Sequence, residues 1–143
     1  MSNKLTAKER LAIDRVHMSE RDPQARSRTF DEVNQGLTLE EAIREAQRCL
    51  QCKNRQCVTG CPVAVSIPEF INALAEGDLP KAAGILRRDN ALPGVCGRVC
   101  PQETQCEELC VRKVKGKPVA IGYLERFVAD WAMLHEAELV QEP

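Results

Sequence analysis

The sequence predicts an all-α fold. Apolar residues recur at helical spacing in several segments, and helix-capping patterns precede some of these segments. No segment shows sustained alternation of apolar and polar residues, and the β-branched residues are scattered, so a sheet is not expected. Aromatic residues make up only 3% of the 143-residue chain, and the core must therefore be built from Ala, Leu, Ile and Val. We expect one compact unit with a thin helical core.

An N-terminal arm, residues 1–36, precedes the predicted domain, residues 37–143. The arm mixes charged residues with isolated apolar ones, and we expect one short helix in it, over residues 5–16. The domain opens with Thr38 and Glu41, which form a capping-box pattern. A helix should follow them and end directly before Cys49, the first cysteine.

Two further helices are expected in the middle of the chain. Ser66 can cap the first of these, and Pro68 fits its first turn. Asp78 starts the second, which continues to about Leu86. A loop at residues 90–94 should separate this helix from two short turns that carry cysteines.

The strongest helical stripe of the chain lies near its C-terminus, over residues 120–134. It predicts a long helix, which begins after a basic connector, residues 112–118. The lysines and the arginine of this connector can offset nearby negative charge, although such a run usually forms a solvated loop.

Composition excludes several classes of partner. The chain has 20 basic and 21 acidic residues and a formal net charge of -1, which favours neither a nucleic acid nor a membrane partner. Residues 1–10 contain no apolar run, and no stretch approaches the length that spans a membrane. We therefore predict a cytoplasmic protein.

The eight cysteines are the main indication of function. Disulfides are uncommon in the cytosol, so ligation of a metal or a cluster is the leading interpretation. Two 4Fe-4S clusters would use eight ligands, and close spacings let one loop contact several iron corners of a cubane. The cysteines form two quartets, Cys49, Cys52, Cys57 and Cys61, then Cys96, Cys100, Cys106 and Cys110.

Proline follows Cys61 and Cys100, as it follows the last cysteine in the bacterial two-cluster pattern, where that cysteine binds the other cluster. By spacing alone, Cys49, Cys52 and Cys57 hold one cluster and Cys61 crosses to the second. A residue of the second half would in turn bind the first cluster. Such an exchange would connect the two halves and compensate for the thin core.

Other interpretations of the cysteines remain open. Structural zinc also takes four thiolates in a tetrahedral arrangement, but zinc sites favour two spaced CxxC pairs. Disulfides or unligated cysteines explain two ordered quartets less well. His17 and His135 are isolated and are not expected to be ligands.

Four segments resemble a known family. They are Arg48-Cys49-Leu50-Gln51-Cys52, Gly60-Cys61-Pro62-Val63, residues 96–101 (CGRVCP) and residues 118–127 (PVAIGYLERF). Together they resemble the N-terminal iron-sulfur domain shared by the small subunit of NADPH-dependent glutamate synthase, dihydropyrimidine dehydrogenase and related flavin oxidoreductases. The resemblance covers roughly residues 22–134, and the glutamate synthase version is the most similar.

The resemblance implies an α-helical ferredoxin-like fold with two 4Fe-4S clusters, and it revises the ligands. The first cluster takes Cys49, Cys52, Cys57 and Cys110. The second takes Cys61, Cys100, Cys106 and a non-cysteine ligand, Glu125, at a position where dihydropyrimidine dehydrogenase has Gln. Cys96 is then spare, although it is the alternative ligand if cysteines alone are counted. Without the resemblance, Glu125 would be an ordinary exposed acid of a first helical turn.

The resemblance also implies a function. The chain would pass single electrons from an FAD, reduced by NADPH in an adjoining domain, to a second redox centre in a flavin-containing large subunit that makes glutamate from glutamine and 2-oxoglutarate. The chain itself would carry no catalytic residue, and its end at Pro143 suggests a fragment of a longer flavoprotein. The alternatives are a non-enzymatic interaction domain stabilised by structural zinc and a free-standing polyferredoxin. The sequence does not determine the oligomeric state.

Overall fold

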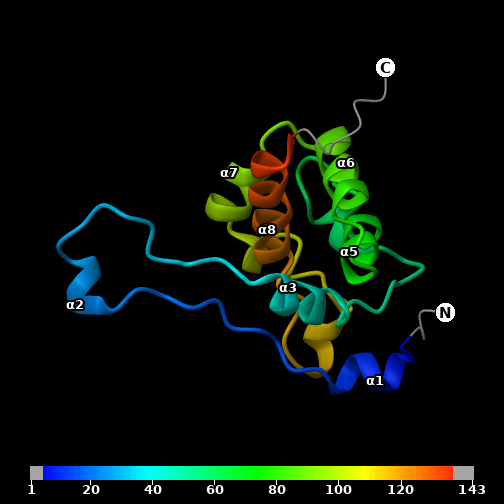
Figure 1. Ribbon diagram of the computed structural model, residues 1–143. Coiled ribbons are helices and arrows are strands. Elements are labelled where there is room, and N and C mark those ends of the chain that lie inside the picture. The colour runs from blue at the N-terminus through cyan, green and yellow to red at the C-terminus, as the bar shows by residue number, and fades with distance from the viewer. Residues whose placement is uncertain (1–4, 137–143) are drawn as a thin grey trace.

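The computed structural model describes residues 5–136, and the regular structure in this range is helical (Figure 1). The one β-type contact there is an isolated bridge between Glu20 and Asn34. The predicted all-α class is therefore confirmed. The helices are α1 (Ala7–Ala12), α2 (Pro23–Arg26), α3 (Leu39–Ala46), α4 (Gln56–Thr59), α5 (Ile67–Ala75), α6 (Leu79–Asp89), α7 (Pro93–Val99) and α8 (Ile121–Leu134), with short 3-10 turns η1 (Gln102–Thr104) and η2 (Val111–Lys115).

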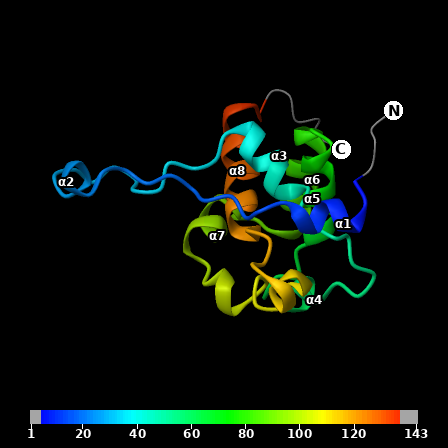
Figure 2. The same ribbon diagram turned by 90° about the horizontal axis from the view of Figure 1, so that it is seen from below.

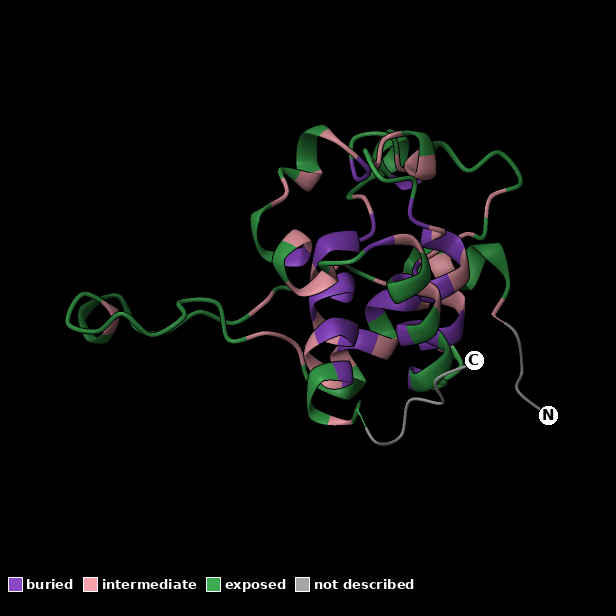
Figure 3. Cartoon of the chain, turned by 90° about the horizontal axis from the view of Figure 1, so that it is seen from above, coloured by how far each residue is buried: buried purple, intermediate pink, exposed green. Residues whose placement is uncertain are grey.

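Helices α3, α5, α6 and α8 surround one apolar core, and α7 packs against α8 (Figures 2 and 3). Phe70 is the only aromatic residue among the buried residues that the structure describes, so the aliphatic core expected from the composition is confirmed. The cysteine-bearing segments around α4, η1 and η2 lie beside these helices (Figure 2). The largest fully buried apolar side chains are Phe70, Ile71, Leu74, Leu86, Leu124 and Val128.

Two of the predicted helix caps are confirmed. The Thr38 hydroxyl accepts a hydrogen bond from the Glu41 N–H at 3.2 Å, and the Glu41 carboxylate accepts one from the Thr38 N–H at 2.8 Å. The Asp78 carboxylate accepts the Lys81 N–H at 3.1 Å and caps α6. Each cap satisfies backbone donors that the first helical turn leaves free.

The expected side-chain cap at Ser66 is wrong. Ser66 does occupy the position before α5, but its hydroxyl makes no capping bond. The hydroxyl lies 3.0 Å from the Arg88 guanidinium, and the Ser66 N–H donates to the Asp89 carboxylate at 2.8 Å. The end of α6 therefore competes for the groups that sequence pattern alone assigned to α5.

The loop expected at residues 90–94 is shorter than predicted, because α7 begins within it at Pro93. Proline fits the first turn of a helix, since its missing N–H would be unpaired there in any case. The glycines at positions 94 and 97 lower the intrinsic helix propensity of this segment. Packing on α8 overrides that propensity.

The N-terminal arm contains two helices where one was expected. The predicted helix is shorter than residues 5–16 and begins with a capping box between Thr6 and Glu9. The additional helix, α2, follows the capping residue Asp22, and the stretch around it projects away from the body (Figures 1 and 3). Phe30 is fully exposed on this projection.

A buried ion pair connects the first part of the arm to the domain. The Arg48 guanidinium lies 2.5 Å from the Glu45 carboxylate, and the two side chains are 1% and 0% exposed. Glu45 also accepts the N–H groups of Val16 at 2.7 Å and Ala120 at 2.8 Å. One carboxylate therefore joins α3, the arm and the start of α8.

Arginine side chains complete this connection through backbone carbonyls. Arg48 donates to Ile13 at 3.1 Å and to Pro118 at 2.9 Å. Arg112 is buried and donates to the carbonyls of Leu11 and Ile13, each at 3.2 Å. The interpretation of the basic connector as a solvated loop is thus wrong at Arg112, which joins the connector to the arm, as Arg15 of the arm also does through the Pro118 carbonyl.

No helix within residues 5–136 combines the length and the apolar character that crossing a bilayer requires.

Loss of the buried carboxylate should destabilise the fold strongly. Glu45→Ala leaves the Arg48 charge buried without a partner, and we expect it to lower the free energy of unfolding by about 3–5 kcal/mol. Chemical denaturation of the anaerobically purified protein measures this. Glu69→Ala, which breaks exposed pairs with Arg55 and Arg88, is the control and should cost at most about 1 kcal/mol. Equal losses in the two variants would contradict the central role of Glu45.

Candidate cluster-binding site

The first cysteine group gathers around the end of α3. Cys49 follows this helix, Cys57 lies on α4, and Cys110 arrives from the far half of the chain at the start of η2. Together with Cys52, these three residues border one cavity. The structure thus places Cys110 of the second half beside the first three cysteines, and its role as a ligand with them stays a prediction.

Gln51 shapes the loop between the first two cysteines. Its backbone has φ 53°, in the left-handed region that non-glycine residues seldom adopt. This conformation turns the chain sharply between Cys49 and Cys52. The Gln51 amide donates to the Cys49 sulfur at 3.4 Å and to the Pro68 carbonyl at 2.9 Å, so the loop is held against the first turn of α5.

The thiols of this group influence one another. Burial, together with the nearby thiols of Cys110 and Cys52, raises the pKa of Cys49 to about 11. Burial and the thiols of Cys49 and Cys110 raise the pKa of Cys57 to about 12. Positively charged iron would oppose these shifts and favour the thiolate forms of Cys49 and Cys57.

The second group lies where the Cys61 segment meets α7, α8 and the turn at Cys106. Burial and the nearby Cys96, Glu125 and Cys61 raise the pKa of Cys100 to about 11. Burial raises the pKa of Cys106 to about 12, with further contributions from Glu107, Cys61 and Glu125. Cys61, Cys100, Cys106 and Glu125 thus share one neighbourhood, and Cys96 lies beside Cys100.

Two glycines allow the close approaches that form this second group. A Cβ atom on Gly60 would lie 2.7 Å from the Gln105 carbonyl oxygen, and this contact brings Cys61 next to Cys106. A Cβ atom on Gly97 would lie 2.6 Å from the backbone nitrogen of Arg126. Only glycine fits at such distances, and the second contact brings α7 against α8 near Glu125.

Glu125 is buried, and not an exposed acid of the first turn. Its side chain lies in α8 at 9% exposure, and burial raises the pKa of its carboxyl group to about 7. Asn90 donates to the Glu125 Oε1 atom at 2.9 Å, which opposes this shift. A buried carboxylate beside three thiols is a chemically suitable oxygen donor for iron.

The two groups fit iron-sulfur clusters in their donor chemistry. Each offers four groups that become anionic ligands on binding iron, and a cubane needs one ligand at each of four iron corners. Within the part of the chain that the structure describes, no three Cys, His, Asp or Glu side chains converge tightly enough to hold a single metal ion. The assignment of particular ligands stays a prediction.

Positive charge lies beside the first group. Arg10 donates to the carbonyls of Gln47 at 3.1 Å and Cys49 at 2.9 Å. Arg112 donates to the Arg48 carbonyl at 3.3 Å, one residue before Cys49. The expectation that basic residues offset negative charge near the cysteines therefore gains support at Arg112.

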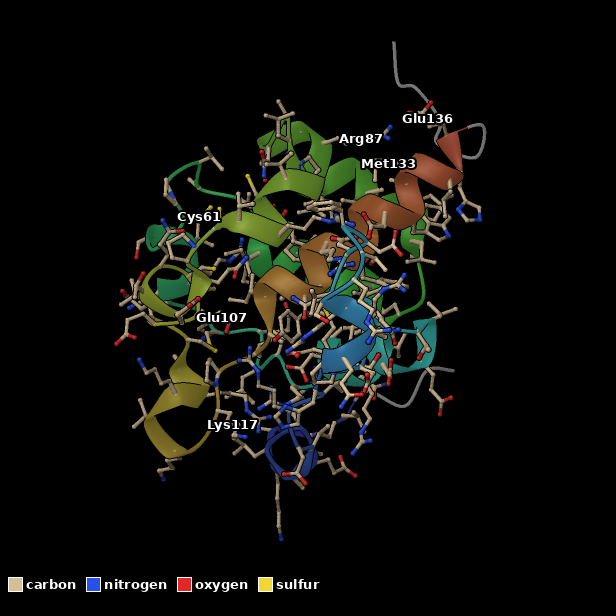
Figure 4. The ribbon with its side chains drawn as sticks, turned by 90° about the vertical axis from the view of Figure 1, so that its left-hand side faces the viewer. Cys61, Arg87, Glu107, Lys117, Met133 and Glu136 are labelled. Atoms are coloured by element: carbon tan, nitrogen blue, oxygen red, sulfur yellow. The ribbon has the colours of Figure 1, made fainter. Side chains whose placement is uncertain are left out.

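Figure 4 shows Cys61 and Glu107 on the side of the molecule away from Glu136, which lies two residues after the end of α8.

Sequence reasoning missed several residues that build the site. Gln51, Asn90 and Arg10 act through their side-chain contacts, and no spacing rule singles them out. Gly60 offered a usable signal, because a glycine beside a candidate ligand often marks a close backbone approach. His135 follows α8, where its ring contacts the Trp131 carbonyl oxygen at 2.8 Å.

The chain is a small helical domain with two groups of thiols, a donor set that suits iron-sulfur clusters. It belongs to the family whose model is described as dihydropyrimidine dehydrogenase domain II, 4Fe-4S cluster, which matches residues 26–137. The glutamate synthase [NADPH] small chain of Halomonas elongata is 35% identical over 84% of the chain. The NAD-dependent dihydropyrimidine dehydrogenase subunit PreT of Escherichia coli is 38% identical over 78% of it.

The relatives are much longer than this chain. The chain spans 25% of the Halomonas small chain and 27% of Escherichia coli PreT. The Escherichia coli glutamate synthase small chain, 36% identical over 120 residues, is also covered to 25% of its length. The chain is thus similar to one iron-sulfur domain of larger oxidoreductases, and the resemblance found in the sequence is confirmed.

The grouping of the thiols predicts which cluster each cysteine supports. Cys110→Ser should remove the cluster at Cys49, Cys52 and Cys57, although Cys110 is nearest in sequence to Cys106. Iron should fall from about eight to about four per chain. Iron analysis and electron paramagnetic resonance (EPR) of the reduced protein measure the outcome. Cys106→Ser is the matched variant and should remove the other signal, so loss of the same signal in both variants would contradict the grouping.

Proposed function

We propose that this chain is a two-cluster electron-relay domain of an NADPH-dependent flavin oxidoreductase of the glutamate synthase small-chain type. The observation that supports it most directly is the exchange between the halves. Cys110 lies with the first three cysteines, and Cys61 lies with the cysteines of the second half. Two separate sets of four donors result, which suits two cubane clusters.

The proposed ligands of the first cluster are Cys49, Cys52, Cys57 and Cys110. Those of the second are Cys61, Cys100, Cys106 and Glu125, with Cys96 as the alternative to Glu125. A bound cluster would supply reversible uptake of single electrons. The protein residues supply the thiolates, the buried surroundings and the fixed positions, and no catalytic residue is assigned to this chain.

The helical scaffold suits a relay because it holds the donor groups on fixed elements. Cys57 lies on α4, and Glu125 lies on α8. The Arg112 guanidinium lies near Cys110 and the Arg10 guanidinium lies near Cys49, and their positive charge opposes the negative charge of thiolate-bound iron. A site held this way changes little in geometry when its charge changes, as electron transfer requires.

The proposed partners lie outside this chain. They are an FAD- and NADPH-binding domain that donates electrons, and a flavin-containing large subunit or domain that accepts them and forms glutamate from glutamine and 2-oxoglutarate. The glutamate synthase small chains among the relatives support this choice, and PreT supports a pyrimidine-reducing system as the second candidate. We propose a cytoplasmic location for the assembly.

Cluster content separates this proposal from a zinc-stapled domain. Anaerobically purified protein should be brown and carry about eight irons and eight sulfides per chain, as two 4Fe-4S clusters. Metal and sulfide analysis, together with the visible spectrum, tests this. Colourless protein with stoichiometric zinc and negligible iron would exclude the proposal, whereas about four irons would reduce it to one cluster.

The ligand choice between Glu125 and Cys96 is tested by a pair of variants. Glu125→Ala should damage the cluster held by Cys61, Cys100 and Cys106, by conversion to a three-iron form or by complete loss. Cys96→Ala should keep both clusters. EPR of the oxidised and reduced protein, with iron analysis, reports each outcome. The reverse pattern, with loss only in Cys96→Ala, would show that the cysteine is the ligand.

A further inference from the structure

Asn90 occupies a buried position between two helices of the site. It ends α6, has an extended backbone and is 7% exposed. Its side chain contacts Glu125 on α8 and lies near Cys96 on α7. A buried amide at this junction connects both candidates for the last ligand position.

The hydrogen bonds of Asn90 determine which way its amide faces. The Oδ1 atom accepts the Leu92 backbone N–H at 3.0 Å, and a backbone N–H can only donate. The Nδ2 atom must therefore face the other way, where it donates to Glu125 Oε1 at 2.9 Å. The backbone of the loop thus selects the amide orientation, and the amide selects one carboxylate oxygen.

The second oxygen of Glu125 remains available. Within residues 5–136, no hydrogen-bond donor contacts Oε2, while Asn90 engages Oε1. On the other side of the amide, the Cys96 sulfur lies 3.8 Å from Asn90 Oδ1, at the distance of a weak S–H hydrogen bond. Asn90 therefore contacts both Glu125 and Cys96, and it does so through different atoms.

We propose that Asn90 is a positioning residue of the second cluster: its Nδ2 group holds Oε1 of Glu125 so that Oε2 is presented as the iron ligand, while its Oδ1 atom holds the Cys96 thiol outside the ligand set. This inference rests on the proposed role of Glu125 as a ligand. It explains how a chain with a spare cysteine selects a carboxylate at this corner.

Asn90→Asp removes the hydrogen-bond donor to Glu125 and keeps the acceptor. The new carboxylate keeps an acceptor for the Leu92 N–H, so the loop remains supported, but it cannot donate to Glu125 and repels it. We expect the second cluster to be lost at least about 10-fold faster under anaerobic chelator challenge, as is typical when a residue that orients a metal ligand is removed. The oxidised protein should show a three-iron EPR signal, and the first cluster should be unchanged.

Asn72→Asp is the matched control. Asn72 donates to Glu76 at 3.0 Å on α5, so the same chemical change is made at an amide–carboxylate pair outside both cysteine groups. Both clusters should survive the challenge at the wild-type rate. Equal loss in the two Asn→Asp variants would assign the effect to added negative charge and would overturn the proposal.

Exchanging the donor and the acceptor separates orientation from general destabilisation. In Asn90→Asp combined with Glu125→Gln, the new amide can donate to the new carboxylate and still offer its oxygen to iron. We expect the second cluster and its EPR signal to recover. If Asn90→Asp alone yields no folded protein, the double variant decides: recovery supports the proposal, and failure to recover overturns it.

The outcomes also separate this inference from the function it rests on. If Glu125→Ala damages the second cluster but Asn90→Asp leaves it at the wild-type rate, the positioning role is wrong and the ligand assignment stands. If neither variant affects the second cluster, the Glu125 assignment fails and the positioning role fails with it. If the wild-type protein binds no iron, the proposed function itself fails.

Discussion

The buried ion pair of Glu45 and Arg48 is the contact on which the arrangement of the chain depends. Glu45 is fully buried and accepts hydrogen bonds from two other segments, the arm and the start of α8, and Arg48 donates to carbonyls of the arm and of the connector before α8. Burying two charges costs free energy unless nearly every donor and acceptor is satisfied, and here backbone groups complete the set. The pair therefore specifies how these segments meet.

This contact also positions the first cysteine group. Cys49 directly follows Arg48, and the connector that Arg48 binds runs from Cys110 towards α8. Arg10 reaches from α1 to the Cys49 carbonyl, so part of the N-terminal arm supports the site. The thin aliphatic core alone would hold these loops weakly, and ligation by groups from both halves would add to the free energy of folding.

Sequence patterns succeeded where the determining interactions are local. The capping box at Thr38 and the cap at Asp78 involve residues three apart, so their hydrogen bonds follow from the sequence itself. Sequence patterns failed at Ser66, where groups from the end of α6 bind the serine instead. They also failed at α7, whose packing on α8 outweighs the low helix propensity of two glycines. The buried state of Arg112 was also missed, because its partners lie about a hundred positions away.

By itself, the sequence determined the helical class, the aliphatic core and the chemistry of eight thiols in two quartets, because periodicity, composition and spacing are written along the chain. The tertiary structure decided what spacing alone left open: Cys110 lies near Cys49, Glu125 is buried beside the thiols of the second group, and Asn90 contacts both Glu125 and Cys96. The contacts of Glu125 and Asn90 depend on how α6, α7 and α8 pack together, and the position of Cys110 depends on how η2 meets the end of α3. Packing is a property of surfaces in contact, and residues 35 positions apart carry no local sign of it.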